Sequence, residues 1–432
     1  MITTMRNFLL PILMVILTAG LLTAQESELT KTLHAYADLA FWQPIQKKTI
    51  QKKTIQKKSV QKKTIDITNE NLIEAIELAR TYILNHQKTE GNFVYSVNLQ
   101  TESVKGTDNQ VRQAGALWSV SFINRYRFNE QTFQALIKGL DFFANNIKEL
   151  PTGQKCITYL DNQCIQTGTV AIYCLALMDL LEGKDNNLAD NLRTKYRELL
   201  EMHIDYLKAQ ELENGSWSKE YDISTGIQNP EGSSYFDGES LYAYCRAART
   251  FNRQDLLPRI QSAIPKLVSR YCVDALNFKG PKNPAHGFYQ WACLAFAEYT
   301  EAGWPEHRAI VRDAAMTLSW WQIYKNNLPT RKGNTGYAIE GIVSAYRVAD
   351  VHQLQKEKEI LKETAMSVLK RLMPLQYKGP FMSLNPKLSS LTSVPPLCEG
   401  GITSGLDSYE VRIDTVQHQA HAMLLFQKYL LP

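Results

Sequence analysis

The stretch GTVAIYCLALM, residues 168–178, carries an apolar or small side chain at almost every position. A surface helix keeps one polar face, so a helix of this composition must be buried on all sides. The preceding helical pattern, residues 130–147, differs because it mixes polar residues with apolar ones at spacings of three and four. The chain therefore predicts a buried helix paired with a half-exposed one.

The same alternation recurs along the chain from residue 67 onward. The half-exposed members carry many charges, such as Glu74, Glu77 and Arg80 in the first, and the buried members are apolar nearly all round. Six buried helices alternating with six half-exposed ones predict an all-α fold, with an inner barrel wrapped by an outer ring. The six predicted pairs span residues 71–87 and 112–126, 130–147 and 167–181, 188–212 and 238–250, 256–271 and 287–300, 306–326 and 337–350, and 355–375 and 415–430.

Two predicted outer helices end in a glutamine followed by a glycine and an aromatic residue, in QKTEGNF (87–93) and QELENGSW (210–217). Glycine ends a helix and permits the chain to reverse. These turns resemble the Q-x-x-x-G-x-W/F turns of α/α toroids, which occur in terpenoid cyclases, protein prenyltransferases and many carbohydrate-active enzymes. The resemblance covers residues 67–432 and implies a six-hairpin (α/α)6 toroid. It does not specify a reaction, because the turn is structural.

The segment before residue 67 has a different character. A basic start at Arg6, an apolar run over residues 8–22 and the small Ala24 predict a signal peptide over residues 1–24, and hence a secreted or periplasmic protein. An uncleaved membrane anchor is the alternative. Residues 25–66 are predicted to be a polar linker, because their Lys-rich pentapeptide repeat fits neither the helical nor the strand period.

The charge of the chain is concentrated in that repeat. Without its eight lysines, the formal charge of +5 becomes −3, so the body is mildly acidic and nothing in it indicates nucleic acid. Membrane contact is expected only through the Lys-rich segment, as a basic arm on anionic lipid or polymer. Among the seven cysteines, Cys156 and Cys164 are the best candidates for a disulfide, since they flank a predicted loop.

Chain direction places the candidate site. Outer and inner helices alternate, so the six segments that lead into inner helices must gather at one mouth of the ring. Glu239 and Glu340 lie in the first turn of two buried helices, and His286 begins another. Carboxyl and imidazole groups exchange protons near neutral pH, so these three are the predicted catalytic residues.

Other polar and aromatic residues of the same segments are predicted to bind substrate. Two arginines near the first and last inner helices suit an anionic ligand group, and aromatic rings suit sugar faces. Alternatives remain open: the aspartates could cap helices, the arginines could form ring-closing ion pairs with Asp108 and Asp414, and each histidine could be structural. The predicted binding residues are Arg112, Asp108, Tyr235, Tyr289, Trp291, Tyr337, Arg412, Asp414 and His418.

No metal or cofactor is predicted. The chain lacks an H-E-x-x-H motif, paired C-x-x-C motifs and the Asp-rich motifs of terpenoid cyclases. The sequence therefore favours an exported carbohydrate-active enzyme that acts on a polar or acidic saccharide by hydrolysis, β-elimination or epimerisation. Two alternatives are a toroid that binds glycan or peptide without turnover, and a terpenoid cyclase or hydratase, which would need a dry, aromatic cavity.

Overall fold

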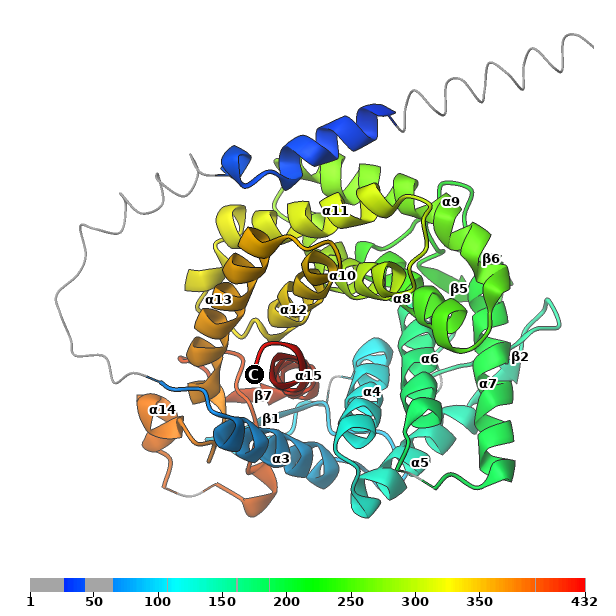
Figure 1. Ribbon diagram of the computed structural model, residues 1–432. Coiled ribbons are helices and arrows are strands. Elements are labelled where there is room, and N and C mark those ends of the chain that lie inside the picture. Colours follow the sequence, from blue (N-terminus) through cyan, green and yellow to red (C-terminus); the bar gives the residue numbers. More distant parts are fainter. Residues whose placement is uncertain are drawn as a thin grey trace, which may run out of the picture.

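The computed structural model describes residues 27–42, 65–106, 108–160, 162–185, 187–392 and 394–431. Within them, two concentric rings of helices form the body of the protein (Figure 1). The outer ring contains α3 (Asn69–Asn85), α5 (Glu130–Ala144), α7 (Asp190–Ala209), α9 (Leu257–Val268), α11 (Arg308–Trp320) and α13 (Gln355–Leu372). The inner ring contains α4 (Gln110–Tyr126), α6 (Thr167–Glu182), α8 (Ser234–Thr250), α10 (Ala285–Glu301), α12 (Gly336–Val351) and α15 (Ile413–Tyr429).

The inner helices form a closed barrel. Each packs against the next in chain order, and α15 packs back against α4 to complete the ring. Every residue of α6 from Thr167 to Leu180 is buried, as the small and apolar side chains over residues 168–178 predict. The small residues Ala171, Ala243, Ala295 and Ala345 are fully buried too, where the helices approach one another. The predicted all-α fold with an inner barrel and an outer ring is confirmed.

The glutamine-glycine-aromatic turns join outer helices to the mouth segments. Gly91 adopts a φ of 115°, which a residue with a side chain would rarely adopt. The Gln87 amide donates to the carbonyl of Gly91 at 3.0 Å and to that of Ala135 at 2.8 Å, and Phe93 is buried beneath the turn. The turn therefore ties the first hairpin to the second.

Short strands brace the segments at the mouth. β1 (Ser96–Asn98) pairs with β7 (Glu410–Arg412) in antiparallel register and joins the first hairpin to the last. β4 (Cys164–Gln166) and β6 (Ile227–Gln228) both pair with β5 (Glu220–Asp222), and β2 (Ile147–Glu149) pairs with β3 (Lys155–Ile157). These pairings hold the loops around the mouth in place.

The opposite end of the barrel is closed by ion pairs. Asp179 is fully buried and accepts hydrogen bonds from Arg125 and Arg246, each at 2.8 Å. Glu298 contacts Arg249 at 2.7 Å and Arg347 at 3.2 Å. Arginine side chains at the C-terminal ends of helices are favoured by the helix dipole.

The expected polar linker needs a correction at residues 27–42. Most of this segment is helical and lies along α11 (Figure 1), where Leu33 and Trp42 are 0% and 2% exposed. The Trp320 indole donates to the carbonyl of Ala37 at 2.8 Å. Burial of the apolar side chains of this segment stabilises its position on the body. The prediction grouped the segment with the neighbouring polar repeat and so did not separate it from the linker.

The predicted signal peptide and almost all of the Lys-rich repeat lie outside the described residues. Within the described part, no helix is long and apolar enough to span a membrane. The expected disulfide is absent from this part of the chain: Cys156 and Cys164 are free thiols, the first of them buried in β3.

Candidate active site

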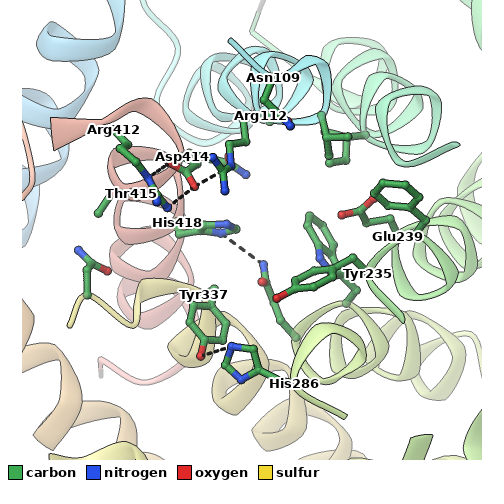
Figure 2. A pocket seen from close by; sticks show the side chains of 18 of the residues that line it. Asn109, Arg112, Tyr235, Glu239, His286, Tyr337, Arg412, Asp414, Thr415 and His418 are labelled. Carbon is green, nitrogen blue, oxygen red and sulfur yellow. Dashed lines mark hydrogen bonds and ion pairs between the residues drawn. The ribbon is translucent and has the colours of Figure 1, made fainter. Parts of the chain in front are cut away.

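A cavity of about 600 Å³ opens at the end of the barrel where the inner helices begin. All six inner helices or the residues just before them contribute to its wall, and its volume falls in the range of about 300–1,000 Å³ typical of small-ligand sites. The predicted residues that line it are Arg112, Tyr235, Glu239, His286, Trp291, Tyr337, Arg412, Asp414 and His418. The predicted convergence of distant segments is therefore present (Figure 2).

Two arginines share one carboxylate on one wall of the cavity (Figure 2). Arg412 contacts Asp414 with Nε at 3.0 Å and Nη2 at 2.8 Å, and Arg112 Nε lies 3.3 Å from Asp414 Oδ2. The side chains of Arg112 and Arg412 are 39% and 35% exposed. Two guanidiniums against one carboxylate leave a net positive charge, so the same cluster closes the ring and can attract an anionic ligand group.

His418 is held by a buried carboxylate. Its Nδ1 lies 2.8 Å from Glu340 Oε1, and Gln290 donates to Glu340 Oε2 at 3.0 Å. Burial opposes the ionisation of Glu340, but contacts with His418 and His421 outweigh it and hold the pKa of this carboxyl below its usual value. The Glu340 carboxylate therefore orients the imidazole ring of His418, which lines the cavity.

Glu239 has the opposite electrostatic environment. It is 2% exposed, and its Oε2 has no hydrogen-bond partner within the described part of the chain. Burial raises the pKa of Glu239 to about 8, so the carboxyl is protonated at neutral pH. Gly168 makes room for it, since a Cβ at that position would meet Glu239 Oε2 at 2.3 Å. Figure 2 shows Glu239 and His418 on opposite sides of the cavity.

His286 belongs to a third polar group, together with Tyr337. Its Nε2 lies 3.3 Å from the Tyr337 hydroxyl and its Nδ1 lies 3.4 Å from the Asn326 amide, so both ring nitrogens face protein groups. Arg331 donates to the same Tyr337 hydroxyl at 2.6 Å. Burial, with a smaller contribution from Arg331, lowers the pKa of His286 and keeps the ring neutral. His286 is thus less available as a base than His418.

Three predicted residues do not line the cavity. Glu340 is fully buried behind His418, and the Tyr289 hydroxyl donates to the carbonyl of Ala338 at 2.8 Å between α10 and α12. Asp108 lies just outside, where it accepts from Tyr159 at 2.6 Å. Asn109, not Asp108, caps α4 by accepting from the Arg112 amide.

Two further residues that the sequence did not predict act at the site: Gln290 donates to Glu340, and Arg331 donates to Tyr337. Arg331 could have been suspected as a cation in a mouth segment, whereas Gln290 has no distinguishing spacing. No group of three His, Cys, Asp or Glu side chains among the described residues is arranged to hold a metal ion.

Comparison with known proteins identifies the fold. No protein-family model and no curated protein matches the chain. Solved structures do match it, among them a D-mannose isomerase with a TM-score of 0.57 and 10% identity, over 84% of this chain and 98% of that one. The chain has the (α/α)6 toroid fold.

Two further structures cover a similar share of the toroid. A GH76 α-mannanase from Bacteroides thetaiotaomicron has a TM-score of 0.57 and 12% identity, over 82% of this chain and 94% of that one. A cellobiose 2-epimerase from Spirochaeta thermophila has a TM-score of 0.56 and 13% identity, over 84% and 98%. The neighbours of this toroid thus include carbohydrate-active enzymes, and at these identities the likeness extends to the fold alone.

Proposed function

We propose that this protein is an exported carbohydrate-active enzyme that moves a proton at a carbon atom of a polar or acidic saccharide, by epimerisation, isomerisation or β-elimination. The observation that carries the proposal is the pair of opposed groups in the cavity. His418 is held by Glu340 through Nδ1, and Glu239 presents a neutral carboxyl across the cavity from it. An imidazole oriented by a carboxylate can act as the base and a neutral carboxyl as the acid, and proton abstraction and delivery require such a pair.

Hydrolysis by Glu239 and Glu340 is the weaker hypothesis. Glycoside hydrolysis needs two carboxyl groups that both face the scissile bond. Glu340 is fully buried and already bonded to His418 and Gln290, so it cannot reach a substrate in the cavity. Its contribution is to orient His418.

The arginine pair supports an acidic or strongly polar substrate. Arg112 and Arg412 carry two positive charges and Asp414 neutralises one of them, so the cluster has a net charge of about +1. It lies on the same wall of the cavity as His418. A carboxylate bound there would also stabilise the negative charge that develops when a neighbouring carbon loses its proton. Tyr235 and Trp291 supply apolar ring faces for a sugar.

The test is incubation of the purified protein with a panel of neutral sugars, uronates and their oligomers in deuterium oxide. Incorporation of deuterium at a sugar carbon, or absorbance from unsaturated uronates, is the expected result. New reducing ends without either product would replace the proposal with hydrolysis. Binding without turnover would leave a glycan-binding toroid.

Variants connect the activity to the residues. His418→Gln and Glu239→Gln are each expected to lower turnover by about 10²–10⁴-fold, the usual contribution of a positioned acid or base. His34→Gln is the matched control, because this histidine lies on the N-terminal helix and its side chain is 76% exposed. Full activity in both cavity variants would overturn the assignment.

A further inference from the structure

A second hollow adjoins the cavity at the mouth. This side pocket has a volume of about 430 Å³ and lies beside the starts of α4 and α6. Asn109 and Gln166 line both the cavity and the side pocket. A ligand too long for the cavity could therefore pass these two residues and continue into the side pocket.

The rear wall of the side pocket is held rigidly. The side-chain amide of Gln110 donates to the backbone carbonyl of Cys164 at 3.1 Å. Its side-chain oxygen accepts from the backbone N–H of Gln166 at 3.2 Å and from the Thr169 hydroxyl at 3.1 Å. Asp108 joins this wall through Tyr159 at 2.6 Å. A wall whose polar groups are already paired keeps its shape when no ligand is present.

The side chains at the front are free for a ligand. Asn162 and Gln163 are exposed, and neither side-chain amide has a hydrogen-bond partner in the described ranges. Each primary amide offers two donors and an acceptor, which match the hydroxyl groups of a sugar. Leu160, 45% exposed, adds an apolar surface beside them.

We propose that the side pocket binds the unit next to the reacting unit, so that the substrate is a saccharide of two or more units and not a free monosaccharide. The inference rests on the proposed function, since it assumes that the reacting sugar occupies the cavity. Continuity through Asn109 and Gln166, a rigid rear wall and two free amides together define the second subsite.

The test compares monomer with oligomer in two variants. The probes are D-galacturonic acid and its dimer and trimer, with mannose and mannobiose as a neutral pair, studied by saturation-transfer NMR and by turnover in deuterium oxide. Asn162→Ala/Gln163→Ala removes both free amides without touching the rear wall. Gln131→Ala/Gln355→Ala is the control, because these exposed glutamines begin outer helices at the opposite end of the ring.

The wild type should bind a dimer about tenfold more tightly than its monomer, and the Asn162/Gln163 variant should lose that advantage while its affinity for the monomer stays unchanged. About tenfold is what one or two neutral hydrogen bonds contribute. Equal affinity for monomer and dimer in the wild type would contradict the proposed second subsite, and so would an equal loss of affinity for both in the variant. Neither result would contradict the proposed function. Dimer binding that depends on the two amides but gives no turnover would support the second subsite and contradict the proposed catalytic function. Absence of binding by every probe would count against both proposals.

Discussion

Replacing Glu239 with glutamine should change the pH dependence of stability in a direction fixed by burial. In the folded protein the pKa of this carboxyl is about 8, against an ordinary value of 4.5. The folded state therefore retains a proton between these values that the unfolded state has released. Stability that is fully present below pH 4.5 is lost as the pH rises toward 8.

The magnitude follows from those two pKa values. At about 1.4 kcal/mol for each pH unit over which only the folded state keeps the proton, the loss between pH 5 and pH 8 is roughly 3–4 kcal/mol. Glutamine has the same shape and cannot ionise, so the variant lacks this loss. The penalty for burying the amide is independent of pH and shifts the whole curve equally.

The assay is urea unfolding of wild type and Glu239→Gln at pH 5, 6, 7 and 8. The free energy of unfolding of the variant, relative to wild type, should increase steadily with pH. Other groups, such as Asp237 with a pKa raised to about 6 by burial, titrate in both proteins and cancel in the difference. A difference that stays constant from pH 5 to pH 8 would show that Glu239 is ionised in the folded protein, and the proposed acid would be lost.

Four other substitutions, one of them a control, test the packing and the site. Trp42→Ala should lower the free energy of unfolding in urea by about 3–5 kcal/mol, because the side chain is buried. Phe41→Ala is the control and should change it by under about 0.5 kcal/mol, because Phe41 is 47% exposed. Equal effects would show that the N-terminal helix does not pack on the body. Ala243→Leu should cost about 1–3 kcal/mol by overpacking the barrel, and a neutral result would contradict its burial. Glu340→Gln should lower kcat roughly 100-fold with little change in KM, because it disorients His418 without touching the arginine wall; a change confined to KM would refute the positioning role.

The fold could be predicted because the alternation between buried and half-exposed helices is visible in the sequence as an alternation of apolar and amphipathic stretches. The gathering of Glu239, His286 and His418 at one mouth followed from chain direction alone. What could not be predicted was which side of a buried helix faces the cavity. Adjacent residues on a helix point about 100° apart, so Tyr289 packs between α10 and α12 while Gln290 lines the cavity.

The N-terminal helix escaped prediction for a different reason. Residues 27–42 are a short segment next to a low-complexity repeat, and their helix depends on contacts with α11 that no local pattern reports. The capping of α4 shows the same limit on a smaller scale. Asp108 and Asn109 are both good capping residues. Asn109 caps α4, while Asp108 accepts hydrogen bonds from Gln113 of α4 itself and from Tyr159 in a distant loop.

The two buried glutamates show how one scaffold can produce an acid and a base at the same pH. Both lie in the second turn of an inner helix and not in the first turn that the sequence predicts, because α8 begins at Ser234 and α12 at Gly336. Burial alone would keep both protonated. Only Glu340 has two histidines beside it, and they lower its pKa, whereas Glu239 has no cation to offset its burial. In the proposed reaction, the Glu340 carboxylate orients His418 as the base, and the uncharged Glu239 donates the proton across the cavity. The ionisation states of the two carboxyl groups thus depend on the histidines that lie beside Glu340 and not beside Glu239.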